Sequence, residues 1–146
     1  MKLISHRGNI NGKNPEMENC PSYIDDTINL GYEVEIDLWV IEKELHLGHD
    51  IPEYKIDLNW LNDRSKKLWI HCKNIEAMSF LNGIDSDFNY FWHQEDTVTL
   101  TSKNFIWAYP GKQPIKNSIA VMPEIYKDNT EECLGICSDY VSLYRK

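Results

Sequence analysis

Short apolar runs separated by polar turns recur along the whole chain. The run 34–40 alternates acidic and apolar residues, and the other runs are short and rich in β-branched or aromatic residues, as strands are. The pattern predicts strands and places them at the ranges 3–5, 34–40, 44–47, 68–73, 88–93, 105–109, 119–122 and 134–137. A further alternating run, 97–101, is expected to pair as part of a hairpin.

Helical signals are fewer and lie mainly in the first half of the chain. Ser22 is a candidate N-cap for a helix over 23–30 that stops at Gly31, and 58–61 lies in a second helical stretch. Asn74 is a candidate cap for a third helix that runs through Leu81. The region 88–121 contains almost no helical pattern.

Strands that alternate with helices predict a parallel α/β fold, and about eight strands suggest a (β/α)8 barrel. That barrel typically takes about 250 residues, whereas this chain has 146. We therefore expect a single domain over 1–146. Its fold class would be α/β, a compact (β/α)8 TIM-type barrel with several outer helices shortened or missing.

Composition narrows the function classes. The chain is 42% hydrophobic, 26% charged and has a formal net charge of -8, which is typical of a folded globular protein and argues against nucleic acid as a partner. No apolar run approaches the length of a membrane span or a signal peptide, so the sequence predicts a cytoplasmic protein without a membrane span. The four cysteines have no zinc-site spacing and are expected to be reduced thiols.

Four short polar clusters lie in the first third of the chain, at or just past the ends of predicted strands. They are His6-Arg7-Gly8, Glu18-Asn19, Glu35-Ile36-Asp37 and His49-Asp50. Together they contain two histidines for proton transfer, carboxylates for a divalent cation and an arginine for a phosphate oxygen. These are the side chains that metal-assisted cleavage of a phosphodiester requires.

Glu35 and Asp37 are separated by one apolar residue on a predicted strand, so their side chains share a face. Two carboxylates on one face of a buried strand are costly unless a cation or hydrogen-bond donors neutralise them. The alternative interpretation is a strand with one solvated face.

In this order the clusters resemble the motifs of the glycerophosphodiester phosphodiesterase family, within the phosphatidylinositol-phospholipase-C-like barrel superfamily. The segment Gly135-Ile136-Cys137-Ser138-Asp139-Tyr140 is similar to that family's closing motif. The likeness is dense from His6 to Asp50 and thin from Pro52 to Cys133.

The resemblance implies that one of the two histidines, His6 and His49, acts as general base and the other as general acid. It also implies metal ligands at Glu35 and Asp37, with Glu18 either a third ligand or a loop anchor. Arg7 and Lys73 would offset phosphate charge. Trp107 would stack on the substrate or lie in the core, and His93 would face the site or pack within an aromatic strand.

One position departs from the family pattern, because the third carboxylate ligand falls on His71. An imidazole suits zinc or manganese better than calcium or magnesium, but it could equally be a core histidine. The expected cofactor is therefore one divalent metal ion, with Mg, Ca, Mn and Zn not distinguished.

The sequence thus predicts a metal-dependent phosphodiester hydrolase whose substrate is a small-molecule or a glycan- or lipid-linked phosphodiester. A non-catalytic protein that binds a sugar phosphate or phosphodiester on the same scaffold is the alternative, and a structural protein that kept the motif is a third. Because missing helices would leave apolar strand faces uncovered, we also expect a homo-oligomer.

Overall fold

The computed structural model describes residues 1–146, which form one ten-stranded sheet with three α-helices. The strands are β1 (Lys2–His6), β2 (Glu33–Ile41), β3 (Glu44–Leu47), β4 (Tyr54–Ile56), β5 (Leu68–Cys72), β6 (Asn89–Phe91), β7 (Val98–Leu100), β8 (Ile106–Ala108), β9 (Ser118–Val121) and β10 (Gly135–Ser138). The helices are α1 (Pro21–Asn29), α2 (Leu58–Asp63) and α3 (Ile75–Gly83), with short 3-10 turns η1 (Ser65–Lys67), η2 (Pro123–Ile125) and η3 (Val141–Tyr144).

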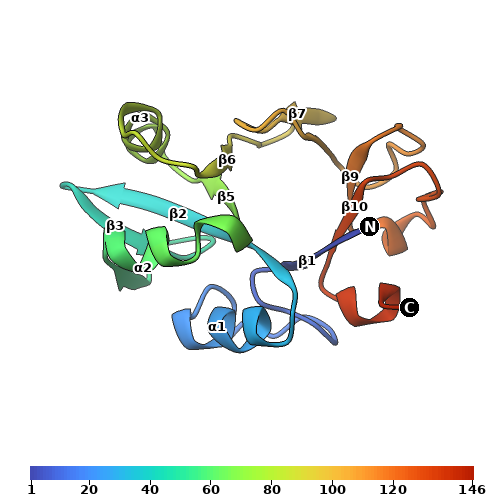
Figure 1. Ribbon diagram of the computed structural model, residues 1–146, viewed down its shortest axis with the longest axis horizontal. Helices are drawn as coiled ribbons and strands as arrows, with labels where there is room; N and C mark the ends of the chain where they lie inside the picture. Colours follow the sequence, from blue (N-terminus) through green and yellow to red (C-terminus); the bar gives the residue numbers. More distant parts are fainter.

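Parallel ladders join seven strands in the spatial order β6-β5-β2-β1-β10-β9-β8. Three antiparallel pairings add β3 to β2, β4 to β3 and β7 to β8. The first and last strands of the chain, β1 and β10, are neighbours, and the sheet curls around a common interior (Figure 1).

The predicted (β/α)8 TIM-type barrel is wrong, because the sheet is a mixed, curled half-barrel. No ladder joins β6 to β7, the strands on either side of the gap; two hydrogen bonds link Tyr90 of β6 to Ser102 in the turn after β7. Only three short α-helices form. The connection 109–117 between β8 and β9 is shorter than the roughly dozen residues that a helical crossover needs, so no helix can cover that side.

The larger apolar core lies on the outer face of β2 and β5, under α1 and α3. Val34, Ile36 and Leu38 alternate along β2 and are fully buried there with Ile70 of β5. This alternation is the period-2 pattern of a strand, and it turns the other residues of β2, Glu35 and Asp37 among them, toward the interior of the curled sheet.

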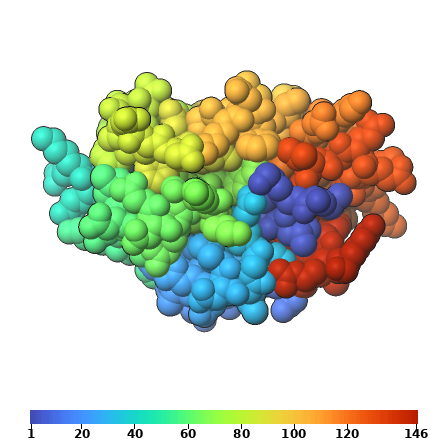
Figure 2. All heavy atoms as spheres, viewed as in Figure 1, coloured from blue at the N-terminus to red at the C-terminus, as the bar shows by residue number.

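A second apolar cluster fills that interior. Trp107 lies between Trp69 and Phe91, with ring centroids 5.7 and 4.7 Å away, and Ile4 and Ile119 pack in the same cluster. Side chains therefore occupy the centre that the ribbon encloses, and the space-filling view has no opening there (Figure 2).

Two predicted helix caps have different outcomes. The Asn74 cap of α3 is confirmed, because its side chain accepts a hydrogen bond from Ala77 N at 3.0 Å. The Ser22 cap is wrong, because α1 begins at Pro21 and Cys20 occupies the cap position. Proline at the first helical position already has the right φ and lacks the N–H that a cap would satisfy.

None of the helices is long and apolar enough to span a membrane. The outward-facing Ala120 of β9 and Ile136 of β10 are fully buried, although no α-helix lies over these strands. The connecting segments therefore cover strand faces that were expected to be bare. The predicted homo-oligomer stays a prediction.

Candidate functional site

Several polar side chains converge where the parallel strands β1, β2, β5 and β10 end. Register brings them together: His6 of β1 lies opposite Glu35 of β2, and Asp37 lies opposite His71 of β5. Carboxyl ends of parallel strands share one edge of a sheet, so residues far apart in the sequence meet at this edge.

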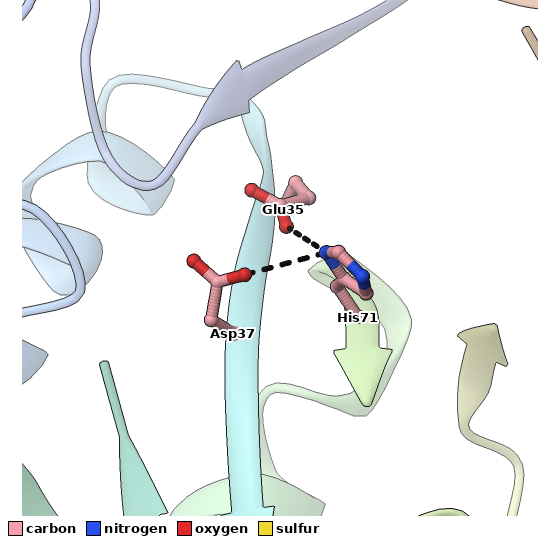
Figure 3. Close-up of side chains that lie close together, drawn as sticks. All are labelled: Glu35, Asp37 and His71. Carbon is pink, nitrogen blue, oxygen red and sulfur yellow. Dashed lines mark ion pairs between the residues drawn. The ribbon is translucent and has the colours of Figure 1, made fainter. Parts of the chain in front are cut away.

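Glu35, Asp37 and His71 form a cluster that could hold a metal ion. One potential ligand atom from each lies within 4.8 Å of the others. His71 Nδ1 is 3.3 Å from Asp37 Oδ1 and 3.8 Å from Glu35 Oε1, and Figure 3 shows both carboxylates directed at this one nitrogen. Glu35 and Asp37 are buried, with exposures of 2% and 0%.

The orientation of the His71 ring is set by its other nitrogen. Nε2 lies 2.7 Å from the carbonyl oxygen of His93, so it must carry a proton and donate it. In the neutral ring Nδ1 then presents a lone pair to two carboxylates, which is repulsive. Either a second proton or a cation relieves that repulsion, and a backbone carbonyl behind the ring is the usual support of a metal-binding histidine.

The carboxylates also lack partners of their own. Glu35 Oε2 and Asp37 Oδ1 are buried and accept no hydrogen bond within the protein. Lys73 Nζ, at 3.8 Å from Asp37 Oδ1, is an ion-pair partner but not a hydrogen-bond donor at that distance. Buried carboxylate oxygens left open in this way fit a bound cation.

The two carboxyl groups differ in acidity. Burial and the neighbouring Asp37 charge raise the pKa of Glu35 well above its usual range. Burial would also raise the pKa of Asp37, but the neighbouring imidazoles of His49 and His71 and the charge of Arg7 hold it well below its usual range. Asp37 is thus the stronger acid of the pair, and Glu35 takes up a proton more readily than Asp37 does.

Asn19 holds Asp37 in place. Its amide donates to Asp37 Oδ2 at 2.9 Å and its carbonyl oxygen accepts from the Asp37 backbone N–H at 2.9 Å. Asn19 is fully buried with a φ of 63°, a left-handed conformation that asparagine tolerates better than most residues. Sequence reasoning noted the Glu18-Asn19 pair but assigned a role only to its first residue.

Glu18 lies outside the metal cluster. Its two oxygens accept from Arg7 Nη1 at 3.2 Å and from Asn9 Nδ2 at 2.9 Å, so it anchors the loop that carries Arg7. Arg7 in turn places Nε 3.1 Å from Asp37 Oδ2. Burial would lower the pKa of Arg7, but the carboxylates of Asp37 and Glu35 outweigh it and raise that pKa.

His6 has the geometry of a proton acceptor. Its Nδ1 lies 2.8 Å from Asp139 Oδ1, and its Nε2 lies 3.9 Å from Glu35 Oε2. Asn9 also donates to Asp139, at 2.8 Å. Burial would raise the pKa of Asp139, but the hydrogen bonds from His6 and Asn9 lower it, so this carboxylate fixes the His6 tautomer with Nε2 unprotonated.

His49 lies at the rim of the site, with 39% of its side chain exposed. Its Nδ1 is 3.5 Å from Asp37 Oδ2 and its Nε2 is 3.3 Å from Arg7 Nη2. A hollow of about 300 Å³ opens beside His49, Arg7 and Glu18. Of the two predicted proton-transfer residues, His49 lines this hollow and His6 does not.

Two predicted binding residues do not present their rings to this site. Trp107 is 3% exposed and packed within the inner apolar cluster, so its ring belongs to the core. His93 is 4% exposed, and neither ring nitrogen has a hydrogen-bond partner. Burial, together with the charge of His71, lowers the pKa of His93 to about 4. His93 touches the site through its backbone carbonyl.

Comparisons with known proteins add no relative: no protein-family model, no curated protein and no solved structure matches this chain.

Proposed function

We propose that this chain is a metal-dependent phosphodiester hydrolase similar to the glycerophosphodiester phosphodiesterases. The observation that carries the proposal is the position of His71 Nδ1, which faces two buried carboxylates while Nε2 is already bound to a backbone carbonyl. His6, His49, Arg7 and Lys73 surround this cluster, and a hollow lined by Arg7 and His49 opens beside them.

Glu35, Asp37 and His71 would hold a divalent cation. A carboxylate and imidazole set suits manganese or zinc better than calcium, which prefers a shell of about six to eight oxygens. When bound, the cation would polarise the phosphate and offset the negative charge that builds up on its oxygens.

His6 is the better candidate for the general base. Asp139 occupies its Nδ1, so Nε2 can accept the proton of a nucleophile, which is water or a neighbouring hydroxyl of the substrate. The nucleophile's oxygen forms a new bond to phosphorus as its proton moves to Nε2. Asp139 then stabilises the imidazolium that results.

His49 is the candidate for the general acid. It lies on the other side of Asp37 from His71, at the rim where a departing group can leave. As the second oxygen–phosphorus bond breaks, the leaving alkoxide would take a proton from His49, and the Asp37 carboxylate stabilises the protonated ring beforehand. Lys73, with its ammonium group 3.8 Å from Asp37 Oδ1, would offset phosphate charge.

One observation favours a second candidate, a protein that binds a phosphodiester or sugar phosphate without cleaving it. The Arg7 guanidinium is already engaged by Glu18, Asp37 and His49, so it is not free to clamp a phosphate in this arrangement. A hydrolase would need Arg7 to change partners when substrate enters.

The deciding experiment is hydrolysis of bis(p-nitrophenyl) phosphate and of a glycerophosphodiester with Mg, Ca, Mn and Zn in turn. We expect turnover with Mn or Zn that disappears in the Glu35→Ala/Asp37→Ala double variant. Glu44→Ala is the control, because Glu44 is an exposed carboxylate paired with Lys55 on the neighbouring hairpin strand. No turnover with any metal in a folded protein, together with binding of phosphate ligands, would favour the second candidate.

The expected cytoplasmic location stays a prediction.

A further inference from the structure

A second hollow opens at the same edge of the sheet, beyond His93. It has a volume of about 450 Å³, and its walls include Glu95, Asp96, Tyr109, Lys112, Ile125 and Tyr126. Tyr109 follows β8 and Ile125 lies in η2 after β9, so the hollow lies at the carboxyl ends of two parallel strands. We call it the tyrosine hollow.

His93 connects the tyrosine hollow to the metal cluster. Its ring lies against the ring of Tyr109, with centroids 3.5 Å apart, and its Nδ1 is 3.8 Å from Asp96 Oδ2. Its carbonyl oxygen accepts the hydrogen bond from His71. The buried His93 therefore contacts a wall of the tyrosine hollow with its ring and the metal cluster with its carbonyl oxygen.

The aromatic surface of the hollow is open. Tyr126 is 67% exposed, and its ring lies over Gly111, where an added Cβ would come within 3.2 Å of the ring. The absence of a Cβ at Gly111 thus lets the ring approach the backbone closely at this point. Burial and the charges of Asp96 and Glu95 raise the pKa of Tyr109, so both carboxylates act on that wall.

The charges of the hollow argue for a neutral ligand rich in hydroxyl groups. Glu95 and Asp96 would repel an anion, and the ammonium group of Lys112 would oppose a cation. Carboxylates accept hydrogen bonds and an ammonium donates them, so together they satisfy sugar hydroxyls. An exposed aromatic ring offers a flat apolar surface for the C–H face of a sugar.

We propose that the tyrosine hollow binds a sugar ring esterified to the phosphate that is cleaved at the metal cluster. The inference rests on the proposed function and names its substrate class: a glycosyl or sugar-alcohol phosphodiester. Tyr126 supplies the stacking surface, and Glu95 and Lys112 bond the hydroxyl groups.

The test compares three p-nitrophenyl phosphodiesters that share the leaving group and differ in the second ester group: ethyl, choline, or the 6-hydroxyl of methyl glucoside. We expect kcat/KM to be about tenfold higher for the glucoside than for the ethyl ester, as one aromatic contact can contribute. Tyr126→Ala should remove this advantage and leave the ethyl ester within about twofold. Tyr126→Phe, the matched control, should keep it.

Equal rates for all three diesters, or an equal loss for ethyl and glucoside in Tyr126→Ala, would overturn the sugar assignment. A preference for the choline ester that Glu95→Gln abolishes would do so too, since it would make the hollow an ammonium site. If no diester is cleaved, the proposed function fails, and the sugar assignment is then tested by binding of methyl glucoside alone. Saturation-transfer NMR with methyl glucoside must then show a signal that Tyr126→Ala loses and Tyr126→Phe keeps; no signal in the wild-type protein would also overturn the assignment.

Discussion

Glu33 and Glu35 lie two residues apart on β2, on the same inner face of the sheet, yet their surroundings differ. The carboxylate of Glu33 accepts hydrogen bonds from Lys2 Nζ at 2.9 Å and from Trp69 Nε1 at 2.6 Å, so both oxygens have partners. Glu35 has one oxygen that accepts no hydrogen bond, and its other oxygen faces the Nδ1 of His71. The strand β2 thus carries a fully hydrogen-bonded carboxylate at its amino end and, toward its carboxyl end, a carboxylate that lacks hydrogen-bond donors.

The comparison distinguishes a carboxylate that stabilises the fold from a carboxylate that is available to a ligand. A carboxylate such as that of the half-buried Glu33, whose two oxygens both accept hydrogen bonds from within the chain, needs no further partner. A buried carboxylate without partners carries a desolvation cost that only a ligand, a proton or a cation removes. We therefore expect the chemistry at the carboxyl ends of the strands, whereas the charged residues at their amino ends stabilise the sheet.

The largest expected effect is on turnover at the carboxyl end. His6→Ala should lower kcat by about a thousandfold, because it removes the proton acceptor, while metal binding is retained. Asp139→Asn should lower it less and change the pH profile, because it alters the tautomer of His6 and not its presence. Steady-state kinetics over pH on the metal-loaded protein measures both. Unchanged kcat in His6→Ala would remove His6 from the mechanism.

The next effect is on metal affinity. His71→Ala should weaken binding of Mn or Zn by about a hundredfold, since it removes one of three ligands. His46→Ala is the matched control, because His46 lies on β3 and pairs with Trp39 and Lys55 away from the cluster. Titration calorimetry should find that the control keeps its affinity; equal affinities in wild type and His71→Ala would show that the cluster is not the metal site.

A smaller effect sharpens the contrast between the two glutamates. Without metal, Glu33→Gln should lower the free energy of unfolding by about 1–2 kcal/mol, because it weakens the bonds to Lys2 and Trp69. Glu35→Gln should leave it unchanged or raise it by up to about 1 kcal/mol, because it removes a carboxyl group whose charge is costly to bury at that position. Urea denaturation measures both values. A large loss in Glu35→Gln alone would reverse the distinction.

The smallest effect concerns pH and His93. Its pKa is lowered to about 4 in the folded state, below the value of 6.5 for an unperturbed histidine. The unfolded chain therefore binds more protons between these values, so the stability from this residue is present above pH 6.5 and is lost as pH falls toward 4. His93 should account for about 1–2 kcal/mol of lost unfolding free energy between pH 7 and pH 5.

The His93→Phe variant isolates that contribution, because other groups also titrate in this range. Denaturation curves at pH 7 and pH 5 should show a smaller loss of stability in the variant than in the wild type. Equal losses would mean that His93 is protonated as readily in the folded protein as in the unfolded chain.

Local pattern was enough to find most of the elements. The strand 34–40, the helix capped by Asn74 and the shared face of Glu35 and Asp37 follow from spacing within a few residues. The closed barrel was wrong because closure depends on which distant strands pair, and no ladder forms between β6 and β7. Strand count alone does not determine closure.

The sequence by itself determined that imidazole and carboxylate groups end up at strand ends, because strand periodicity directs alternate side chains to one face. Only the tertiary structure decided which of them meet. His6 and Asp139 are 133 positions apart in the chain and 2.8 Å apart in space, and Asn19, not Glu18, is bonded to Asp37. The pairing of distant strands sets those contacts, and no local pattern encodes it.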